Sequence, residues 1–188
     1  MCVFNDEPAH DYVEFAEGMR KSDVPEGVHY LRGIFPPEFL ESLDEVMEET
    51  PSTSVSNNMY AERRFIRSPG IASAILACLP KELSMSHVLS DMKFIRYPAG
   101  GYIAPHVDGV RADDVTHTES TTSFLLYLAC IPPGEGGETE ILTQVNGGEV
   151  ICGFRPQRGC LLVFPHSTPH QGAGVGVHPK ILLRGDMY

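Results

Sequence analysis

The sequence contains few basic residues and no run of them. Lysine and arginine together number 14, against 25 aspartate and glutamate residues, which gives a formal net charge of -11 at pH 7. Binding to nucleic acid depends on clustered lysine and arginine side chains that neutralise phosphates. The composition therefore argues against a nucleic-acid partner, and the acidity itself bears on solubility rather than on a reaction.

Cysteine is scarce, and its spacing does not match a disulfide framework. The five cysteines are odd in number and include no CxxC pair. Because free cysteine is among the residue types most often buried, we expect four of them to be buried free thiols in a reducing compartment. These four are Cys78, Cys130, Cys152 and Cys160.

Long hydrophobic runs are absent as well. Residues 1–17 contain acidic side chains and no long apolar stretch, so we expect no secretory signal. No segment has the roughly 20 apolar residues that a membrane-spanning helix needs. These absences predict an intracellular, cytoplasmic protein without a membrane partner.

The chain is long enough for one structural domain, with 188 residues of which 42% are hydrophobic. Residues 1–91 are expected to form a lead-in and supporting helices, packed on a core made of residues 92–188. A strand is expected near Tyr30–Ile34, and Ser52–Asn58 is expected to be a polar loop. Two helices are expected where prolines are followed by apolar residues at helical spacing. They begin at Pro36-Pro37 and at Pro69, and they end near Thr50 and Pro80.

From about Met92 the pattern changes to short runs of β-branched and aromatic residues separated by glycine and proline, which is typical of strands. Helices followed by strands favour a mainly β fold of the α+β class, with the helices on one face of an antiparallel double sheet. Six strands are expected, at Lys93–Tyr97, Ser123–Leu128, Thr139–Leu142, Glu149–Cys152, Cys160–Phe164 and Ile181–Leu183.

A histidine and an aspartate two residues apart, His106 and Asp108, suggest a metal site. Side chains two residues apart on an extended backbone point to the same face. A second histidine beside them would complete a two-histidine, one-carboxylate set, which suits a non-haem Fe(II) ion with open coordination positions. His166 and His170 both follow the same expected strand, and spacing alone leaves both open.

Several segments of the second half of the chain occur in a distinctive order. They are Tyr97–Asp108, Ser123–Leu128, Gly136–Thr139, Phe154–Pro165 and then His170, Val175 and Lys180. In this order the second half resembles the iron(II)- and 2-oxoglutarate-dependent dioxygenases, specifically the prolyl 4-hydroxylase-like branch. The first half matches only in placing helices ahead of the barrel. The resemblance implies a double-stranded β-helix, which is a jelly-roll barrel.

The resemblance also implies a chemistry. It assigns Fe(II) to His106, Asp108 and His170, and so decides between the two later histidines. It implies 2-oxoglutarate and O2 as cosubstrates, with ascorbate as a reductant. The reaction is hydroxylation of an unactivated C–H bond with release of succinate and carbon dioxide. The carboxylate of Asp108 favours hydroxylation over the halogenation carried out by relatives that have a small residue there.

The resemblance implies that Lys180, ten residues after His170, pairs with the distal carboxylate of 2-oxoglutarate. A dianion in a pocket needs a cation, and a buried charge must be paired. Arg184 is the alternative cation, because residues four apart on a strand share a face. It would otherwise lie at the pocket rim or pair with Asp186.

Three further residues are implied to contact the cosubstrate or line its pocket. Tyr127 would donate a hydrogen bond to the same carboxylate, Tyr97 would line the iron pocket, and the hydroxyl of Thr139 would lie near the cosubstrate. Each also fits an ordinary structural role, because aromatic residues and threonine are common in packed strands.

Three kinds of partner fit these features. The first is a prolyl residue in a peptide, the second is a free amino acid or other small molecule, and the third is the metal or 2-oxoglutarate of a non-catalytic sensor. The polar segment Gly109–Thr122 is a candidate substrate loop or an ordinary connection. Asn57–Arg67, with Tyr60, Arg63, Arg64 and Arg67, is a candidate for the opposite rim.

Overall fold

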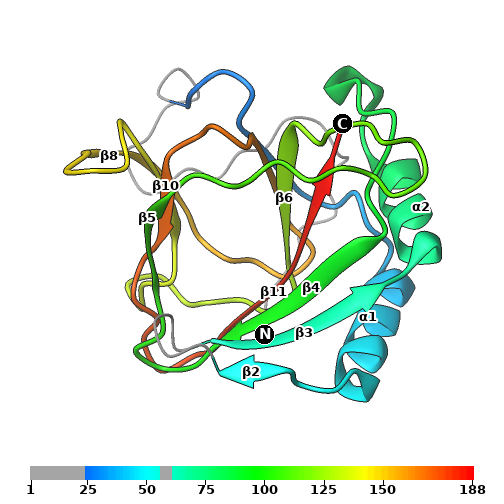
Figure 1. Ribbon diagram of the computed structural model, residues 1–188. Helices are drawn as coiled ribbons and strands as arrows, with labels where there is room; N and C mark the ends of the chain where they lie inside the picture. Colours follow the sequence, from blue (N-terminus) through cyan, green and yellow to red (C-terminus); the bar gives the residue numbers. More distant parts are fainter. Residues whose placement is uncertain (1–23, 56–60) are drawn as a thin grey trace.

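Two antiparallel sheets face each other, and two helices cover the outer side of the larger sheet (Figure 1). The computed structural model describes residues 24–55 and 61–188. Within these residues the larger sheet has seven strands, in the order β1 (His29–Leu31), β9 (Leu161–Pro165), β6 (Thr122–Tyr127), β11 (Lys180–Met187), β4 (Asp91–Tyr97), β3 (Glu62–Arg67) and β2 (Ser54–Val55). The smaller sheet has four, in the order β5 (Ile103–His106), β10 (His170–Gly172), β7 (Thr139–Leu142) and β8 (Val150–Phe154).

Both helices begin at a proline, whose fixed backbone angle suits the first turn. They are α1 (Pro37–Glu49) and α2 (Pro69–Cys78), and a short 3-10 helix, Lys81–Leu83, follows α2. The hydroxyl of Ser68 caps α2 by accepting a hydrogen bond from the N–H of Ile71 at 3.2 Å. None of the helices in the described part of the chain is both long and apolar enough to cross a lipid bilayer.

Alternation of side chains along the strands divides the core into two layers. On β4, Ile95 and Tyr97 face the smaller sheet, whereas Phe94 faces the helices. On β6, Tyr127 lies between the sheets and Leu126 packs under the helices. Only one face of each strand can therefore line a cavity between the two sheets.

The predicted architecture is confirmed: the fold is mainly β, and both helices pack on one side of a double antiparallel sheet. The two helices, the six predicted strands and the early strand, here β1, are present with small shifts at their ends. The predicted loop at 52–58 is wrong in part, because Ser54–Val55 form β2, while residues 56–60 lie outside the described residues.

Besides β2, three strands were not among those predicted: β3, β5 and β10. Two of them are very short, with four residues in β5 and three in β10. In β3 the face that is turned toward the smaller sheet carries Arg63 and Arg67 on either side of Phe65, so the usual apolar alternation is hidden.

The prediction that four cysteines are buried free thiols is wrong for one of them. Cys78, Cys152 and Cys160 are free, although Cys78 is only half-buried. Burial raises the pKa of Cys152 to about 11, which keeps that thiol protonated. Cys130, by contrast, is disulfide-bonded. Cys130 is half-buried just beyond β6. The apolar residues before it were therefore not sufficient to predict that it is a buried thiol.

The layer under α1 predicts which helix residue supports the fold most. Leu43 has no exposed surface and packs between α1 and the larger sheet. Leu43→Ala is expected to lower the free energy of unfolding by about 2–5 kcal/mol, because it leaves a cavity in a packed layer. Urea denaturation followed by circular dichroism measures this. Glu45→Ala, at an exposed position of the same helix, is the control and should change it by less than about 0.5 kcal/mol.

Candidate functional site

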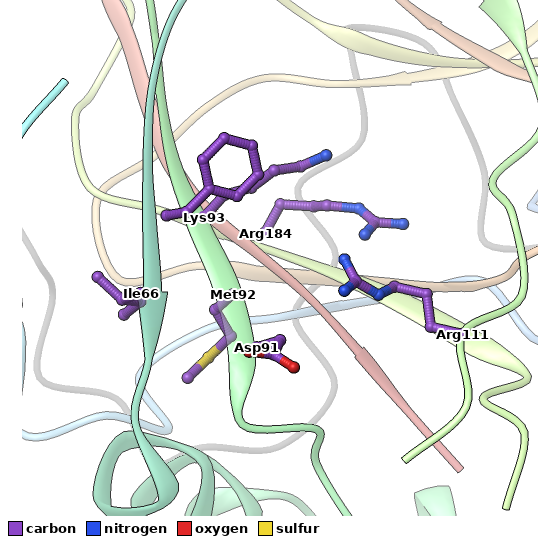
Figure 2. Close-up of a pocket in the computed structure, with 7 residues that line it drawn as sticks. Ile66, Asp91, Met92, Lys93, Arg111 and Arg184 are labelled. Carbon is purple, nitrogen blue, oxygen red and sulfur yellow. The ribbon is translucent and has the colours of Figure 1, made fainter. Parts of the chain in front are cut away.

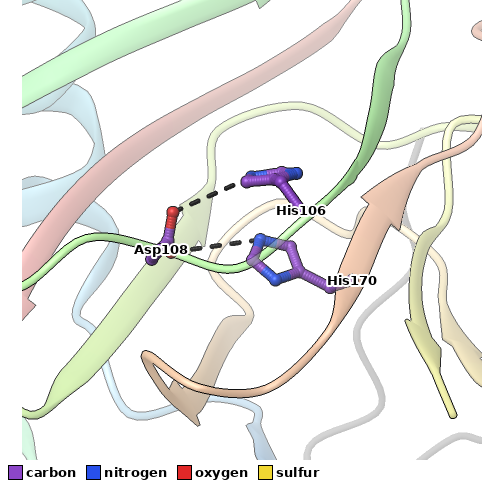
Figure 3. Close-up of side chains that lie close together, drawn as sticks. All are labelled: His106, Asp108 and His170. Carbon is purple, nitrogen blue, oxygen red and sulfur yellow. Dashed lines mark ion pairs between the residues drawn. The ribbon is translucent and has the colours of Figure 1, made fainter. Parts of the chain in front are cut away.

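Three side chains predicted to bind a metal lie together at the end of the smaller sheet where β5 ends and β10 begins (Figure 3). His106 ends β5 and His170 begins β10, and the two residues are directly paired across these strands, with ring centres 4.2 Å apart. Asp108 follows two residues after the end of β5, where its N–H donates to the carbonyl of His166 at 3.0 Å. One nitrogen or oxygen atom from each of His106, Asp108 and His170 lies within 4.8 Å of the others.

The hydrogen bonds of the two histidines fix where their protons are. His106 Nδ1 lies 2.8 Å from the carbonyl oxygen of Ala104, and His170 Nδ1 lies 2.9 Å from that of Thr168. A carbonyl oxygen can only accept, so each Nδ1 carries a proton, and in the neutral imidazole Nε2 then presents a lone pair. The two Nε2 atoms face the carboxylate of Asp108 at 3.8 and 3.9 Å, which is too far for a hydrogen bond. Three electron-pair donors thus converge with no proton between them, as in a site for a cation.

The charge states of these groups suit a cation as well. Burial, reinforced by the neighbouring His106, lowers the pKa of His170 to about 4, so its imidazole is neutral at physiological pH. Burial opposes ionisation of Asp108, but the Arg184 guanidinium and the Ser123 hydroxyl hold its pKa below the usual range. The cluster therefore offers two imidazoles, of which that of His170 is neutral, and one carboxylate, the set of donors that suits non-haem Fe(II).

A chain of hydrogen bonds holds the carboxylate of Asp108 in place. Ser123 Oγ donates to Asp108 Oδ2 at 2.5 Å, so it must accept from Nδ1 of His166 at 2.8 Å. Burial lowers the pKa of His166 and keeps it neutral, so its Nε2 accepts from Ser120 Oγ at 2.8 Å. His166, the competitor of His170 in the sequence, is thus occupied on both ring nitrogens and lies outside the metal cluster.

A cavity of about 500 Å³ lies between the sheets, beside the metal cluster. Three pairs of directly opposed residues on β4 and β11 line it, and they define three successive levels. The pairs are Tyr97 with Lys180, Ile95 with Leu182, and Lys93 with Arg184. The cavity therefore has a cationic side chain at each end and an apolar middle, and four residue steps on a strand separate the two ends by roughly 13 Å.

Lys180 and Thr139 form the polar contacts at the first level. Lys180, which is 3% exposed, donates from Nζ to Thr139 Oγ1 at 3.0 Å. The hydroxyl of Tyr127 donates to the same oxygen at 2.8 Å. With both lone pairs of that oxygen engaged, the hydroxyl hydrogen of Thr139 is free to donate into the cavity. Burial lowers the pKa of Lys180 to about 7, although nearby Glu138 and Glu140 favour its charged form.

The space beside Lys180 depends on two further residues. A Cβ on Gly172 would lie 2.9 Å from Ile103 Cγ2 and 3.7 Å from Lys180 Nζ, so only glycine leaves this corner open. Tyr97 lines the cavity as predicted, 6.0 Å from Lys180 Nζ to its ring centre. Tyr127 is fully buried, and its hydroxyl donates to Thr139, which lines the cavity; its contact with the cosubstrate stays a prediction.

Arg184 is committed to carboxylates of the chain. Its guanidinium donates to Asp186 Oδ2 at 2.9 Å and lies 3.4 Å from Asp108 Oδ1. The predicted pairing with Asp186 is therefore confirmed. It leaves Lys180 as the cation at the opposite end of the cavity, away from the metal ligands.

The candidate rim segment is divided by the alternation of β3. Arg63 lines the cavity, whereas Arg64 faces the helices and donates to carbonyls at the end of α1 at 2.7 and 2.8 Å. Arg67 pairs with Asp114 at 2.7 Å. Tyr60 lies outside the described residues.

The loop between β5 and β6 is ordered by its own contacts. Ala112 and Glu119 form an isolated bridge, and the carboxylate of Asp113 accepts from the N–H groups of Val115 and Thr116 at 2.9 and 2.7 Å. Those bonds, that of Thr116 foremost, hold the pKa of Asp113 at about 2. The residues that line the main cavity do not include any of this loop beyond Asp108.

Several contributors to the site were not predicted, among them Lys93 and Ser123. Lys93 lines the cavity on the same face of β4 as Ile95 and Tyr97. A lysine in phase with two inward-facing residues was the signal that could have identified it. Ser123 opens a predicted strand, and nothing in its local sequence indicates that it would bond to Asp108.

Comparison with protein families gives one match: the profile of the 2OG-Fe(II) oxygenase superfamily matches residues 92–185. Comparison with curated protein sequences gives no match.

Solved structures share the fold at low sequence identity. A prolyl-4-hydroxylase from Pseudomonas putida is 22% identical, covers 86% of this chain and 91% of its own, and has a TM-score of 0.63. The viral collagen prolyl hydroxylase of Paramecium Bursaria Chlorella virus-1 is 18% identical, with coverages of 86% and 95% and a TM-score of 0.63. HygX from Streptomyces hygroscopicus, solved with nickel, 2-oxoglutarate and hygromycin B, is 11% identical, with coverages of 86% and 82% and a TM-score of 0.62. The jelly-roll fold of these proteins is thus present in this chain.

The buried neutral His170 predicts an acid-dependent loss of stability. Its pKa lies near 4 in the folded chain and near 6.5 when unfolded. The unfolded state therefore binds more protons between these values, and the free energy of unfolding falls as the pH drops from about 6.5 to 4. This one group contributes up to roughly 3 kcal/mol of that fall.

The measurement is urea denaturation of the metal-free protein at several pH values. His170→Asn should flatten the pH dependence, whereas His117→Asn, at an exposed position whose positive φ of 58° asparagine tolerates, should not. Equal slopes for His170→Asn and the unmodified protein would contradict the prediction.

Proposed function

The chain belongs to the 2OG-Fe(II) oxygenase superfamily, and we propose that it is an Fe(II)- and 2-oxoglutarate-dependent hydroxylase whose metal is held by His106, Asp108 and His170. The observation that carries the proposal is the convergence of two imidazole lone pairs and one carboxylate without an intervening proton. Such a set is costly in an apolar surrounding unless a cation occupies its centre.

Each ligand is oriented by a group of the chain. The carbonyls of Ala104 and Thr168 hold the Nδ1 protons, so that both Nε2 atoms stay free for the metal. Ser123 and Arg184 keep Asp108 ionised. When bound, Fe(II) with 2-oxoglutarate and O2 supplies the oxidation of an unactivated C–H bond, with succinate and carbon dioxide as coproducts. The chain itself positions the reactants and limits access of water.

Lys180 is proposed to bind the distal carboxylate of 2-oxoglutarate. It is the cation at the far end of the cavity, and Gly172 leaves room beside it. Thr139 directs a hydroxyl proton into the same space, because its oxygen already accepts from Tyr127 and Lys180. A carboxylate there would gain one charged and one neutral hydrogen bond.

Hydroxylation of a prolyl residue is the substrate assignment that the neighbours support. Two of the structures that share the fold are described as prolyl hydroxylases. A free amino acid or other small molecule is the second candidate, and the cationic side chain of Lys93 in the cavity favours it.

The test is anaerobic addition of Fe(II) and 2-oxoglutarate, followed by visible absorption. A metal-to-ligand charge-transfer band is expected with the unmodified protein, and release of succinate is expected once air and ascorbate are admitted. Asp108→Ala removes a ligand and should abolish both.

The control is Asp114→Ala, at an exposed carboxylate of the β5–β6 loop, which should leave both signals unchanged. Absence of the band in the unmodified protein would refute the proposed function. Full succinate release by Asp108→Ala would remove Asp108 from the ligand set.

A second prediction concerns the cation. Lys180→Ala is expected to raise the 2-oxoglutarate concentration for half-maximal succinate release about tenfold to hundredfold, because a charged hydrogen bond contributes roughly 1.5–3 kcal/mol. The affinity for Fe(II) should change far less.

Because burial lowers the pKa of Lys180 to about 7, the affinity for 2-oxoglutarate should fall as the pH rises above 7. Lys180→Arg should remove that dependence, since a guanidinium keeps its proton. A larger effect of Arg184→Ala than of Lys180→Ala would transfer the role to Arg184.

A further inference from the structure

The cavity carries more positive charge than its cosubstrate requires. Four cationic side chains line it, Arg63, Lys93, Lys180 and Arg184, against the single carboxylate of Asp108. This excess occurs in a chain whose formal net charge is -11. With Lys180 assigned to 2-oxoglutarate and Arg184 paired with Asp186, the positive charge that remains to be explained is that of Lys93, at the opposite end.

The surplus is costly to the folded protein. Lys93 and Arg184 are directly opposed on β4 and β11, and like charges in this position destabilise a sheet. Figure 2 shows the side chains of Lys93 and Arg184 extending to the same side of the sheet, with Arg111 reaching toward them from a loop on that side. Arg111 lines a smaller cavity of about 80 Å³, which shares Lys93 and Arg184 with the main one.

The two opposed cations differ in what neutralises them. Arg184 is paired with Asp186 and lies close to Asp108. No hydrogen bond or ion pair joins the ammonium of Lys93 to any other residue in the described ranges. Burial first, and then Arg184 and Arg63, lower the pKa of Lys93 to about 8, so it is still protonated at pH 7. Lys93 is thus a half-buried cation that faces a cavity without a partner in the described part of the chain.

Arg63 extends this cationic end toward the middle of the cavity. It stands opposite Ile95 on β3, lines the cavity and is 8% exposed. Between the two cationic ends lie the apolar side chains of Ile95, Leu125 and Leu182. A ligand with its anionic group at Lys93 would place its hydrocarbon part against the near side of this apolar middle, beside the metal cluster, while 2-oxoglutarate extends from Lys180 on the other side.

We infer that Lys93 binds a carboxylate of the substrate, and that the substrate is a small carboxylic acid such as a free amino acid. The inference rests on the proposed function and names the substrate class of the same site. A prolyl residue inside a peptide is neutral and brings no charge to this end. A free acid carries its carboxylate into the 500 Å³ cavity with the carbon that is to be oxidised.

The experiment compares free L-amino acids, proline included, with their primary amides, each at equal concentration with Fe(II) and 2-oxoglutarate. Release of succinate above the level without substrate is measured. At least one free acid is expected to stimulate it, and the matching amide is expected to have a kcat/KM at least tenfold lower. A panel of proline peptides blocked at both ends is measured in parallel.

Variants of Lys93 test the residue itself. Lys93→Met should raise the KM for the active acid about tenfold to hundredfold and abolish the preference over the amide, and Lys93→Arg should retain that preference. Lys81→Met, which removes an exposed lysine, is the control and should behave as the unmodified protein. Calorimetric titration of the acid into the protein without O2 should show the same loss of affinity in Lys93→Met.

The outcomes distinguish a failure of the proposed function from a failure of the inference about Lys93. Failure of the unmodified protein to bind 2-oxoglutarate in the presence of Fe(II) would refute the proposed function. If 2-oxoglutarate binds, three results overturn the inference alone: no free acid stimulates release of succinate, amides or blocked peptides serve as well as acids, or Lys93→Met keeps the KM of the unmodified protein.

Discussion

The register of β11 between β4 and β6 is the constraint on which the cavity depends. Antiparallel pairing places Lys180 opposite Tyr97 and Arg184 opposite Lys93, and the two-residue repeat turns all of them to the same side. A slip of one residue would turn these charges into the apolar layer under the helices. The charges can occupy an otherwise apolar interior only because the register is held on both sides, by β4 and by β6.

The sequence predicted the parts of the protein whose side chains repeat at a regular period. The helices and the longer strands follow from apolar spacing, and His106 and Asp108 from a two-residue interval. By contrast, β3 was hidden because its inward face carries arginines, and β10 because three residues are too few to reveal a period. The hydrogen bond from Ser123 to Asp108 joins residues 15 apart in the chain. No local sequence pattern indicates such a contact, so it is seen only in the folded structure.

The site also costs the protein stability. Neutral histidines, an ionised aspartate and opposed cations lie in a region that apolar residues could have filled more favourably. The extended layer between the helices and the larger sheet, with residues such as Leu43 and Phe94 at or near zero exposure, provides the compensating burial. The residues of the larger sheet that line the cavity and those that pack under the helices thus lie on opposite faces of that sheet.

The contrast between an acidic exterior and a cationic cavity has a kinetic consequence. A dianion that approaches the protein first meets the repulsion of a net charge of -11, and meets the attraction of the cavity only at short range. Dissolved salt screens interactions beyond about 8 Å at physiological ionic strength, while buried charges are screened much less. Moderate ionic strength therefore lowers the outer barrier more than it weakens the inner attraction. Anionic reactants should enter this protein faster as salt rises, opposite to the usual behaviour of electrostatically steered association.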